Sequence, residues 1–374
     1  MSPRLILLAK ALIALFVGVL LGAGLSTRAL ADHHADSSDE GVVSDTSDVS
    51  EASDARLEGA AKEVVPPPIG VRFGEALEGN TVRVSYAWER IRSQGLAVGR
   101  DNVTPDYVRG VLGYTQTPRS LEVTVHTVAV AWAPHPRVTL VAEVPFVQKE
   151  LERVDPSVGA VGFYGTARRQ VQTEGIGDVS FSIVIPFIRK GVESSQVHVG
   201  FDVPTGSIRR SESTPGGPMI LPYDSQIGNG TVDFEWGWTY KGETELFSWG
   251  GQALGRHPIG RNGRDYREGS RFTGRLWAGF RIAKGVSASV RTEWEKQNNS
   301  EGFDRDLRPT FDPAETSKLQ GGAQILVAPG LSIDLPQLDG QRIAFEFGIP
   351  VYQDLDGPQL ERDWTARAGW QWVY

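Results

Sequence analysis

The chain ends in WTARAGWQWVY, residues 364–374, where aromatic and small apolar side chains occupy every second position. One face of this stretch carries Trp364, Ala366, Ala368, Trp370, Trp372 and Tyr374. A period of two is the period of a β-strand, because successive side chains of a strand point to opposite faces. The stretch therefore predicts a terminal strand with one apolar and one polar face.

The same period recurs along the chain from residue 81. It is clear in six further stretches, 81–91, 179–187, 197–203, 231–240, 286–295 and 343–351, and weaker near 121–132, 137–149, 245–256, 272–282 and 318–329. Together these predict twelve strands of about ten residues, a length that crosses a bilayer at a tilt near 45°. Strands of water-soluble proteins are usually nearer five or six residues.

The predicted connections alternate between long and short along the whole chain. The long ones include 92–120, 150–175 and 205–228, and the short ones 133–136 and 283–285. Short periplasmic turns and longer external loops are typical of outer-membrane barrels. Hydrocarbon offers no partner to an open strand edge, so a sheet that spans lipid must close. We predict an all-β fold over residues 69–374: an up-and-down antiparallel transmembrane β-barrel of about 12 strands, with both ends on the periplasmic side. A water-soluble sandwich with an aromatic core is the alternative.

Aromatic residues support this prediction. Tyr86, Trp88, Trp238, Tyr240, Trp249, Trp294, Trp364 and Trp372 fall on the apolar face, many near strand ends, as in an aromatic girdle. The last strand, with Trp370, Trp372 and Tyr374, is similar to the terminal strand by which barrels are recognised by the barrel-assembly machinery. The expected partners are therefore that machinery, outer-membrane lipids and lipopolysaccharide.

The first 31 residues have the organisation of a secretory signal peptide. Arg4 and Lys10 precede the apolar run 11–25, and Ala29-Leu30-Ala31 is a small-x-small cleavage site. An uncleaved membrane anchor is the alternative. We expect export to the outer membrane of a Gram-negative-type cell.

Residues 32–68 form a low-complexity acidic segment. Positions 32–63 contain ten acidic and two basic residues and no sustained apolar period. Such a composition cannot bury enough surface to offset the entropy lost on ordering. We therefore predict that residues 32–68 are a disordered periplasmic tether N-terminal to the barrel. After cleavage the chain would begin with the free amine of Asp32, followed by His33 and His34. The amine, two backbone amides and an imidazole can together bind Cu(II) or Ni(II) in a square-planar geometry. Histidines present by chance are the alternative.

Composition excludes several other classes. The 374 residues include no Cys, which excludes disulfides, thiolate metal sites and a cysteine nucleophile, and the formal charge of −8 gives no indication of nucleic-acid binding. After the signal peptide, the chain has no apolar run of about 18 residues, which excludes a helical multi-span protein. We expect no cofactor.

Charged and polar side chains occupy the predicted inner face. The candidates for lining a pore are Arg83, Glu89, Glu122, His126, Glu143, His198, Asp202, Asp233, Glu235, Arg275, Arg281, Arg291, Glu293, Glu346 and Arg367. Both signs occur, and no row of basic residues alone is present, so no anion selectivity is predicted. A hydrated pore for small solutes is one interpretation, and a network of salt bridges that fills a structural barrel is the other.

An enzyme is not expected. A barrel lipid hydrolase would need a serine hydroxyl with a histidine base in hydrogen-bond reach on the lipid-facing side. His126 and His198 are predicted on the inner face instead. Phosphate-binding loops, zinc-helix motifs and nucleophile elbows are absent from the sequence.

Four segments carry a family resemblance. They are EGIGD at 174–178, VPTGSI at 203–208, QIGNGT at 226–231 and FEFGIPVYQDLDGPQLERDWTARAGWQ at 345–371. The chain resembles the outer-membrane family of transporters of the meta-pathway of phenol degradation, over most of residues 70–374. The resemblance implies a barrel and the passage of aromatic or other apolar small molecules.

We therefore expect a monomeric or trimeric outer-membrane channel or transporter for passive passage of small molecules. A non-conducting structural or adhesion barrel is the second hypothesis, and an outer-membrane lipid hydrolase is the third. The sequence does not identify the solute.

Overall fold

The computed structural model describes residues 64–374 apart from 159–163, 215–216, 336–337 and 339. The predicted signal peptide, the predicted tether up to residue 63, and the metal candidates His33 and His34 lie outside the described residues. Within the described part, no helix is both long enough and apolar enough to cross a membrane.

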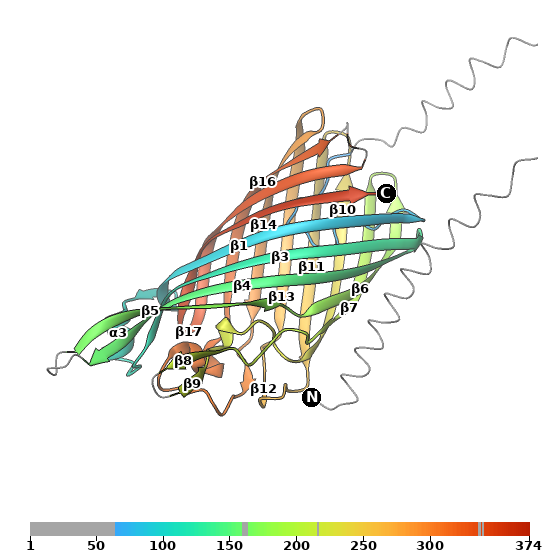
Figure 1. Cartoon of the computed structure of the whole chain (residues 1–374). Helices are drawn as coiled ribbons and strands as arrows, with labels where there is room; N and C mark the ends of the chain where they lie inside the picture. The colour runs from blue at the N-terminus through green and yellow to red at the C-terminus, as the bar shows by residue number, and fades with distance from the viewer. Residues whose placement is uncertain (1–63, 159–163, 215–216, 336–337, 339) are drawn as a thin grey trace, which may run out of the picture. The chain divides into compact units, whose positions relative to one another are not determined.

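Strands dominate the described chain and run obliquely side by side (Figure 1). The elements are β1 (Thr81–Gly99), β2 (Asp101–Val103), α3 (Pro105–Gly110), β3 (Thr117–His135), β4 (Val138–Val158), β5 (Tyr164–Ile176), β6 (Val179–Lys190), β7 (Glu193–Val203), β8 (Ser211–Thr214), β9 (Gly217–Ile220), η1 (Tyr223–Ser225), β10 (Val232–Glu243), β11 (Phe247–Ile259), β12 (Tyr266–Arg267), β13 (Arg271–Ala283), β14 (Val286–Gln297), β15 (Glu301–Gly302), η2 (Pro313–Glu315), η3 (Ser317–Leu319), β16 (Gly322–Leu335) and β17 (Gln341–Val373).

The main sheet is antiparallel and closes into a barrel. Its order is β17-β16-β14-β13-β11-β10-β7-β6-β4-β3-β1, and β17 also pairs with β1. The first half of β17 pairs with β16 and the second half with β1. The two halves lie side by side, because the rings of Phe347 and Trp364 stack 5.9 Å apart and the side chain of Gln353 hydrogen-bonds the backbone of Arg362. Eleven elements therefore close the barrel, and β17, which folds back on itself, raises the count of spanning segments to the predicted twelve. The predicted fold class is confirmed.

Burial along the strands is the inverse of that in a water-soluble protein. On β10, Asp233 and Glu235 are 1% and 8% exposed, whereas Trp236 and Trp238 are 36% and 48% exposed. Apolar residues alternate outward and polar residues inward, as in a barrel whose outer surface meets lipid. The sandwich alternative, with aromatics in the core, was wrong.

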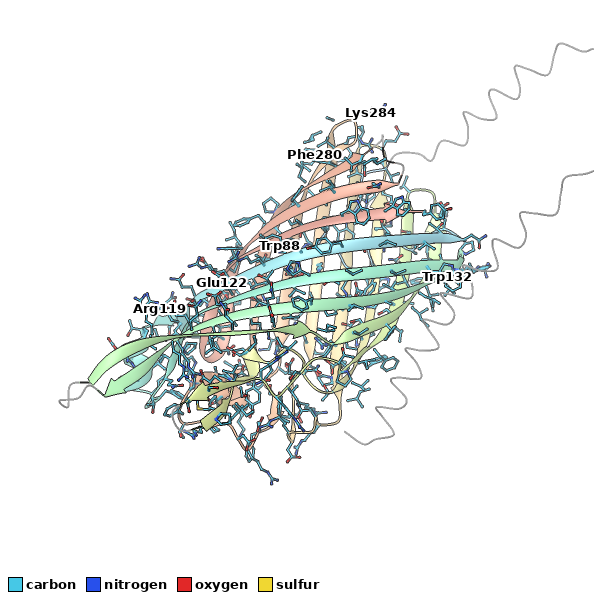
Figure 2. The ribbon with its side chains drawn as sticks, viewed as in Figure 1. Trp88, Arg119, Glu122, Trp132, Phe280 and Lys284 are labelled. Carbon is cyan, nitrogen blue, oxygen red and sulfur yellow. The ribbon has the colours of Figure 1, made fainter. Side chains whose placement is uncertain are left out.

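The two ends of the barrel differ. Short turns such as 136–137, 191–192 and 284–285 lie at one end, which we call the short-turn end. Tyr374 and Val82 exchange two backbone hydrogen bonds of 2.8 Å, so the first and last strands both reach this end. Figure 2 shows Trp132 and Lys284 toward this end and Arg119 near the opposite, long-loop end, where β4 and β5 project as a hairpin.

The segment that contains β5 and β6 is bent. Both strands run antiparallel to β4 and follow each other along it, with Gly177 and Asp178 between them. β6 pairs with β7 as well, whereas β5 pairs with β4 alone among the strands of the described residues. Because an unpaired strand edge is costly in hydrocarbon, β5 belongs to the part of the barrel that lies beyond the bilayer.

A charge placed on the outer face should test this arrangement. Val199 is 41% exposed at the middle of β7. We expect Val199→Arg to lower the free energy of unfolding in lipid by about 2–4 kcal/mol, the cost of arginine near the bilayer midplane. Leu246→Arg, in a turn at the short-turn end, is the matched control and should cost about 0–1 kcal/mol. Denaturant titration in lipid vesicles measures both, and equal costs would contradict the assignment of the outer face.

Candidate functional site in the barrel lumen

Residues 64–80, which we call the lumen segment, run inside the barrel before β1. The amide of Val65 donates to the carbonyl of Thr244 at 3.1 Å, and Ser248 donates to the carbonyl of Pro66 at 3.4 Å. Val65 is 1% exposed. The tether was predicted to extend to residue 68, but residues 64–68 lie within the lumen, because their apolar side chains find buried partners there.

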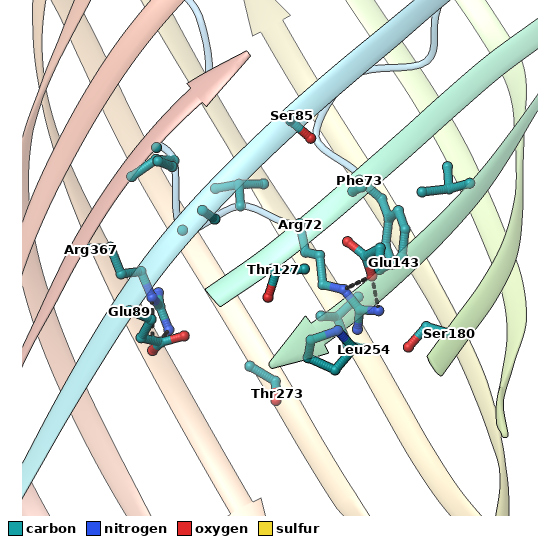
Figure 3. Close-up of a pocket in the computed structure, with 18 of the residues that line it drawn as sticks. Arg72, Phe73, Ser85, Glu89, Thr127, Glu143, Ser180, Leu254, Thr273 and Arg367 are labelled. Carbon is teal, nitrogen blue, oxygen red and sulfur yellow. Dashed lines mark hydrogen bonds and ion pairs between the residues drawn. The ribbon is translucent and has the colours of Figure 1, made fainter. Parts of the chain in front are cut away.

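Arg72 joins the lumen segment to two strands of the barrel, and Figure 3 shows its contact with one of them through Glu143. Its Nε donates to Glu143 on β4 at 2.7 Å, and its Nη1 donates to Glu235 on β10 at 3.0 Å. Its Nη2 also donates to Glu143. β4 and β10 are separated in the sheet by β6 and β7. One guanidinium thus bridges distant parts of the barrel through charge-assisted hydrogen bonds.

Phe73, the residue after Arg72, holds the lumen segment by packing against the inner face of the barrel. Its ring lies 4.4 Å from the ring of His198 and packs in a buried cluster with Leu77, Val141 and Val184, together with Ala131 and Ala133. The backbone of Phe73 has φ 56°, in the left-handed region that bulky residues avoid. Gln196 donates to the carbonyl of Phe73, and Gln252 donates to that of Arg72 at 2.5 Å. These two bonds hold the strained residue in place.

A third contact lies nearer the short-turn end. Glu75 accepts from Arg83 at 3.2 Å and from Arg342 at 3.4 Å. Arg342 also donates to Asp334 at 2.7 Å. The lumen segment is therefore bonded by charged side chains at two levels of the lumen.

A separate row of alternating charges lines the inner face from β1 to β13. The pairs in order are Glu89–Arg367 at 2.7 Å, Arg367–Glu346 at 3.8 Å, Glu346–Arg291 at 3.0 Å, Arg291–Glu293 at 2.7 Å and Glu293–Arg275 at 2.5 Å. Three arginines thus face three glutamates. Buried charges need such partners, because an unpaired charge in a low-dielectric interior is strongly destabilising.

A cavity of about 650 Å³ lies between the lumen segment and the inner face of the barrel (Figure 3). Its lining combines paired charges with apolar side chains, among them Ile69, Val147, Ile227 and Leu254. The volume and the mixed lining suit one small organic molecule.

Most of the predicted pore-lining residues face the interior. The cavity is lined by Arg83, Glu89, Glu143, His198, Asp202, Glu235, Arg275, Glu293 and Arg367. Asp233, Arg291 and Glu346 are buried in the inner face beside it. Arg281 lies at the end of β13, where its amide donates to the carbonyl of Leu246. That these residues line a path for a solute stays a prediction.

Two predicted positions were wrong. On β3, Thr127, Ala129 and Ala131 line the cavity, which places the alternate residues Glu122 and His126 on the outer face. His126 Nδ1 lies 2.7 Å from the hydroxyl of Tyr86, and Glu122 pairs with Arg90. Small apolar residues occupy both faces of β3, so its sequence does not distinguish the inner face from the outer face.

Sequence reasoning missed the lumen segment and Arg256. Arg256 Nε donates to Asp233 at 2.6 Å and lies 3.0 Å from Asp202. The available signal for the lumen segment was the alternation of apolar Ile69, Val71 and Phe73 with Gly70, Arg72 and Gly74. The partners of this segment lie far along the chain, so the signal does not show what the segment contacts.

Three of the segments that carried the family resemblance meet at Asp178. Its carboxylate accepts from the amide of Gly206 at 2.8 Å and from that of Asn229 at 2.9 Å. A Cβ at Gly228 would lie 2.7 Å from the Cα of Gly206, so both positions require glycine. Asp178, Gly228 and Asn229 of this junction also line the cavity.

On the outer face, the predicted aromatic positions Tyr86, Trp238, Trp249, Trp294 and Trp372 are each at least 37% exposed. In the predicted assembly signal, Trp370 donates to Gln341 at 2.9 Å and Tyr374 is 83% exposed. Recognition of this strand stays a prediction.

The histidines do not assemble a hydrolase site in the described part of the chain. His257 Nδ1 lies 2.9 Å from Ser270 Oγ, but the ring packs edge-on against Phe272, and no carboxylate or amide among the described residues bonds its other nitrogen. Serine activation needs a base that is itself oriented by a third group.

Comparison with known proteins agrees with this geometry. The chain aligns over 82% of its length with the whole of the COG4313 outer membrane channel from Pseudomonas putida F1, at 10% identity and a TM-score of 0.56. The chain has the fold of an outer-membrane β-barrel. No family model and no curated protein matches the sequence.

Two other solved barrels are more distant. A Pseudomonas aeruginosa FadL homologue aligns with 83% of this chain and 99% of its own length, at 11% identity and a TM-score of 0.36. The Ralstonia pickettii toluene transporter TbuX aligns with 79% of this chain and 90% of its own, at 8% identity and a TM-score of 0.37. With scores this low, neither contributes to the argument about this chain.

Asp312, in the long loop before β16, allows a test by pH. One of its oxygens accepts from the amide of Ala314 at 2.9 Å, and the side chain is fully buried. Burial, with smaller contributions from Asp224 and Glu315, raises the pKa of Asp312 to about 7. The folded loop therefore holds a proton that the unfolded chain, with a pKa near 3.9, releases. Stability of this loop should fall as pH rises from about 4 to about 7.

We expect Asp312→Asn to remove that dependence, because asparagine mimics the protonated carboxyl. Hydrogen exchange of the loop amides, corrected for intrinsic exchange rates, measures it at pH 5 and pH 8. Protection of the wild-type loop relative to the variant loop should be lower at pH 8 than at pH 5. A constant difference between the two proteins would contradict the raised pKa.

Proposed function

We propose that this protein is an outer-membrane channel that lets small molecules cross passively, aromatic or apolar compounds among them. The observation that carries the proposal is the cavity of about 650 Å³ inside a closed barrel, lined by both paired charges and apolar side chains. The similarity of its fold to an outer membrane channel supports it. So does the sequence resemblance to phenol-pathway transporters, which favours aromatic solutes.

The inferred setting follows from the fold. The apolar outer face would contact outer-membrane lipids and lipopolysaccharide, and the terminal strand with Trp370, Trp372 and Tyr374 would be recognised by the barrel-assembly machinery. The short-turn end would face the periplasm, together with the residues that precede the lumen segment.

The rival is a non-conducting structural or adhesion barrel filled by salt bridges. Planar-bilayer recording of refolded protein separates the two hypotheses. The channel hypothesis predicts discrete current steps. Their ion selectivity should be weak, because the arginines and glutamates of the inner face neutralise one another. Silence at every voltage, also after removal of the lumen segment, would favour the rival.

Single charge changes should shift the ion selectivity in opposite directions. Arg275 and Glu293 line the cavity as a pair 2.5 Å apart. We expect Arg275→Gln to shift the reversal potential in a salt gradient toward cation preference and Glu293→Gln toward anion preference. The double variant should return toward wild type. If neither single variant moves the reversal potential, ions do not pass this pair.

A further inference from the structure

Arg72 and Phe73 contact the barrel as a small ligand would. The guanidinium is bonded by two carboxylates from different strands, Glu143 and Glu235, and the neighbouring phenyl ring lies against His198. The guanidinium carbon is 4.7 Å from the centre of the Phe73 ring. The inner face thus offers an acidic subsite directly beside one that accepts an aromatic ring.

The acidic subsite depends on a cation. Glu143, Glu235, Asp202 and Asp233 all face this part of the lumen, and their side chains are at most 15% exposed. Arg72 and Arg256 are the arginines bonded to them among the described residues. If Arg72 left, four carboxylates would face one guanidinium. Such a site favours a replacement cation, because uncompensated buried charge is costly.

The aromatic subsite is apolar and closely packed. Phe73 is 6% exposed and lies among Ala131, Val141 and Val184. These side chains come from β3, β4 and β6, so the barrel itself would retain the subsite without the lumen segment.

The lumen segment can leave without breaking the sheet. Residues 64–80 join no strand ladder in the described structure and are held by individual hydrogen bonds and ion pairs. Phe73 is also in a strained backbone conformation, with φ 56°. The segment continues directly into β1 at the short-turn end, so withdrawal toward that end requires no crossing of the barrel wall.

We infer that Arg72 and Phe73 occupy a solute site, and that on withdrawal of the lumen segment this site takes small aromatic cations, in which an amine or guanidinium lies next to a ring. This inference rests on the proposed channel function and names its solute class. The lumen segment is then a gate whose two key side chains resemble the solute.

The first test measures selectivity. In planar bilayers, Arg72→Ala should conduct more than the wild type and prefer cations. In gradients of the chloride salts, permeability to phenethylammonium should exceed that to butylammonium, which lacks the ring. Adding Glu143→Gln and Glu235→Gln should reduce the phenethylammonium preference about tenfold, as expected for lost hydrogen bonds to a charged group.

The matched control removes the same charge elsewhere. Glu174→Gln with Glu361→Gln, in the Arg72→Ala background, neutralises two glutamates of the long-loop region. Among the described residues, their carboxylates accept from Gln148 and Asn102, respectively. This variant should keep the phenethylammonium preference. Equal loss in both triple variants would overturn the site, because the effect would then follow total charge alone.

The second test locks the lumen segment. A Cβ at Gly279 would lie 3.2 Å from Cγ1 of Val65, so Val65→Cys with Gly279→Cys brings two thiols close enough for a disulfide in a chain without native cysteine. Oxidation should abolish phenethylammonium permeation and reduction should restore it. Permeation through the oxidised protein would show that the segment does not gate the lumen.

The two tests separate failure of this inference from failure of the proposed function. Current without preference for phenethylammonium in Arg72→Ala would overturn the solute site and leave a channel. Absence of current in wild type, Arg72→Ala and the reduced cysteine variant, each verified as folded by circular dichroism, would overturn both.

Discussion

Closure of the sheet is the constraint on which the rest of the structure depends. Each backbone amide and carbonyl that lies in hydrocarbon must find its partner on a neighbouring strand, because lipid offers none. The ladder between β17 and β1 completes this requirement, with Tyr374 and Val82 bonded to each other in both directions. The last residue of the chain is therefore part of the closure, and a terminal strand with an aromatic outer face serves pairing and lipid contact together.

Closure also determines the chemistry of the interior. Since side chains alternate, an outer face selected for lipid leaves the inner face free for polar residues, and twelve strands enclose more space than side chains of the wall alone fill. Charges in that space are partly desolvated, so each needs a partner. The row from Glu89 to Arg275 satisfies this need within the wall, whereas Glu143 and Glu235 obtain their partner from Arg72 outside the sheet.

The sequence predicted what alternation determines and failed where alternation is weak or contacts are distant. Twelve strands, the inverted burial of β10 and the inward position of His198 follow from a period of two. Glu122 and His126 were misplaced because β3 has small apolar residues on both faces, and a shift of one residue exchanges the faces. The lumen segment escaped prediction because Arg72 is 71 and 163 residues from its partners, and no local pattern encodes such a pairing.

The same non-local pairing gives the lumen segment its significance. A wall that was complete in itself would pair its carboxylates within the sheet, as the row from Glu89 to Arg275 does. Glu143 and Glu235 instead face a residue that belongs to no strand and that sits beside a strained phenylalanine. A permanent structural plug would gain from strand pairing with the wall and from relaxed backbone geometry. The lumen segment has neither, which is the arrangement expected of an occupant that is retained by replaceable interactions.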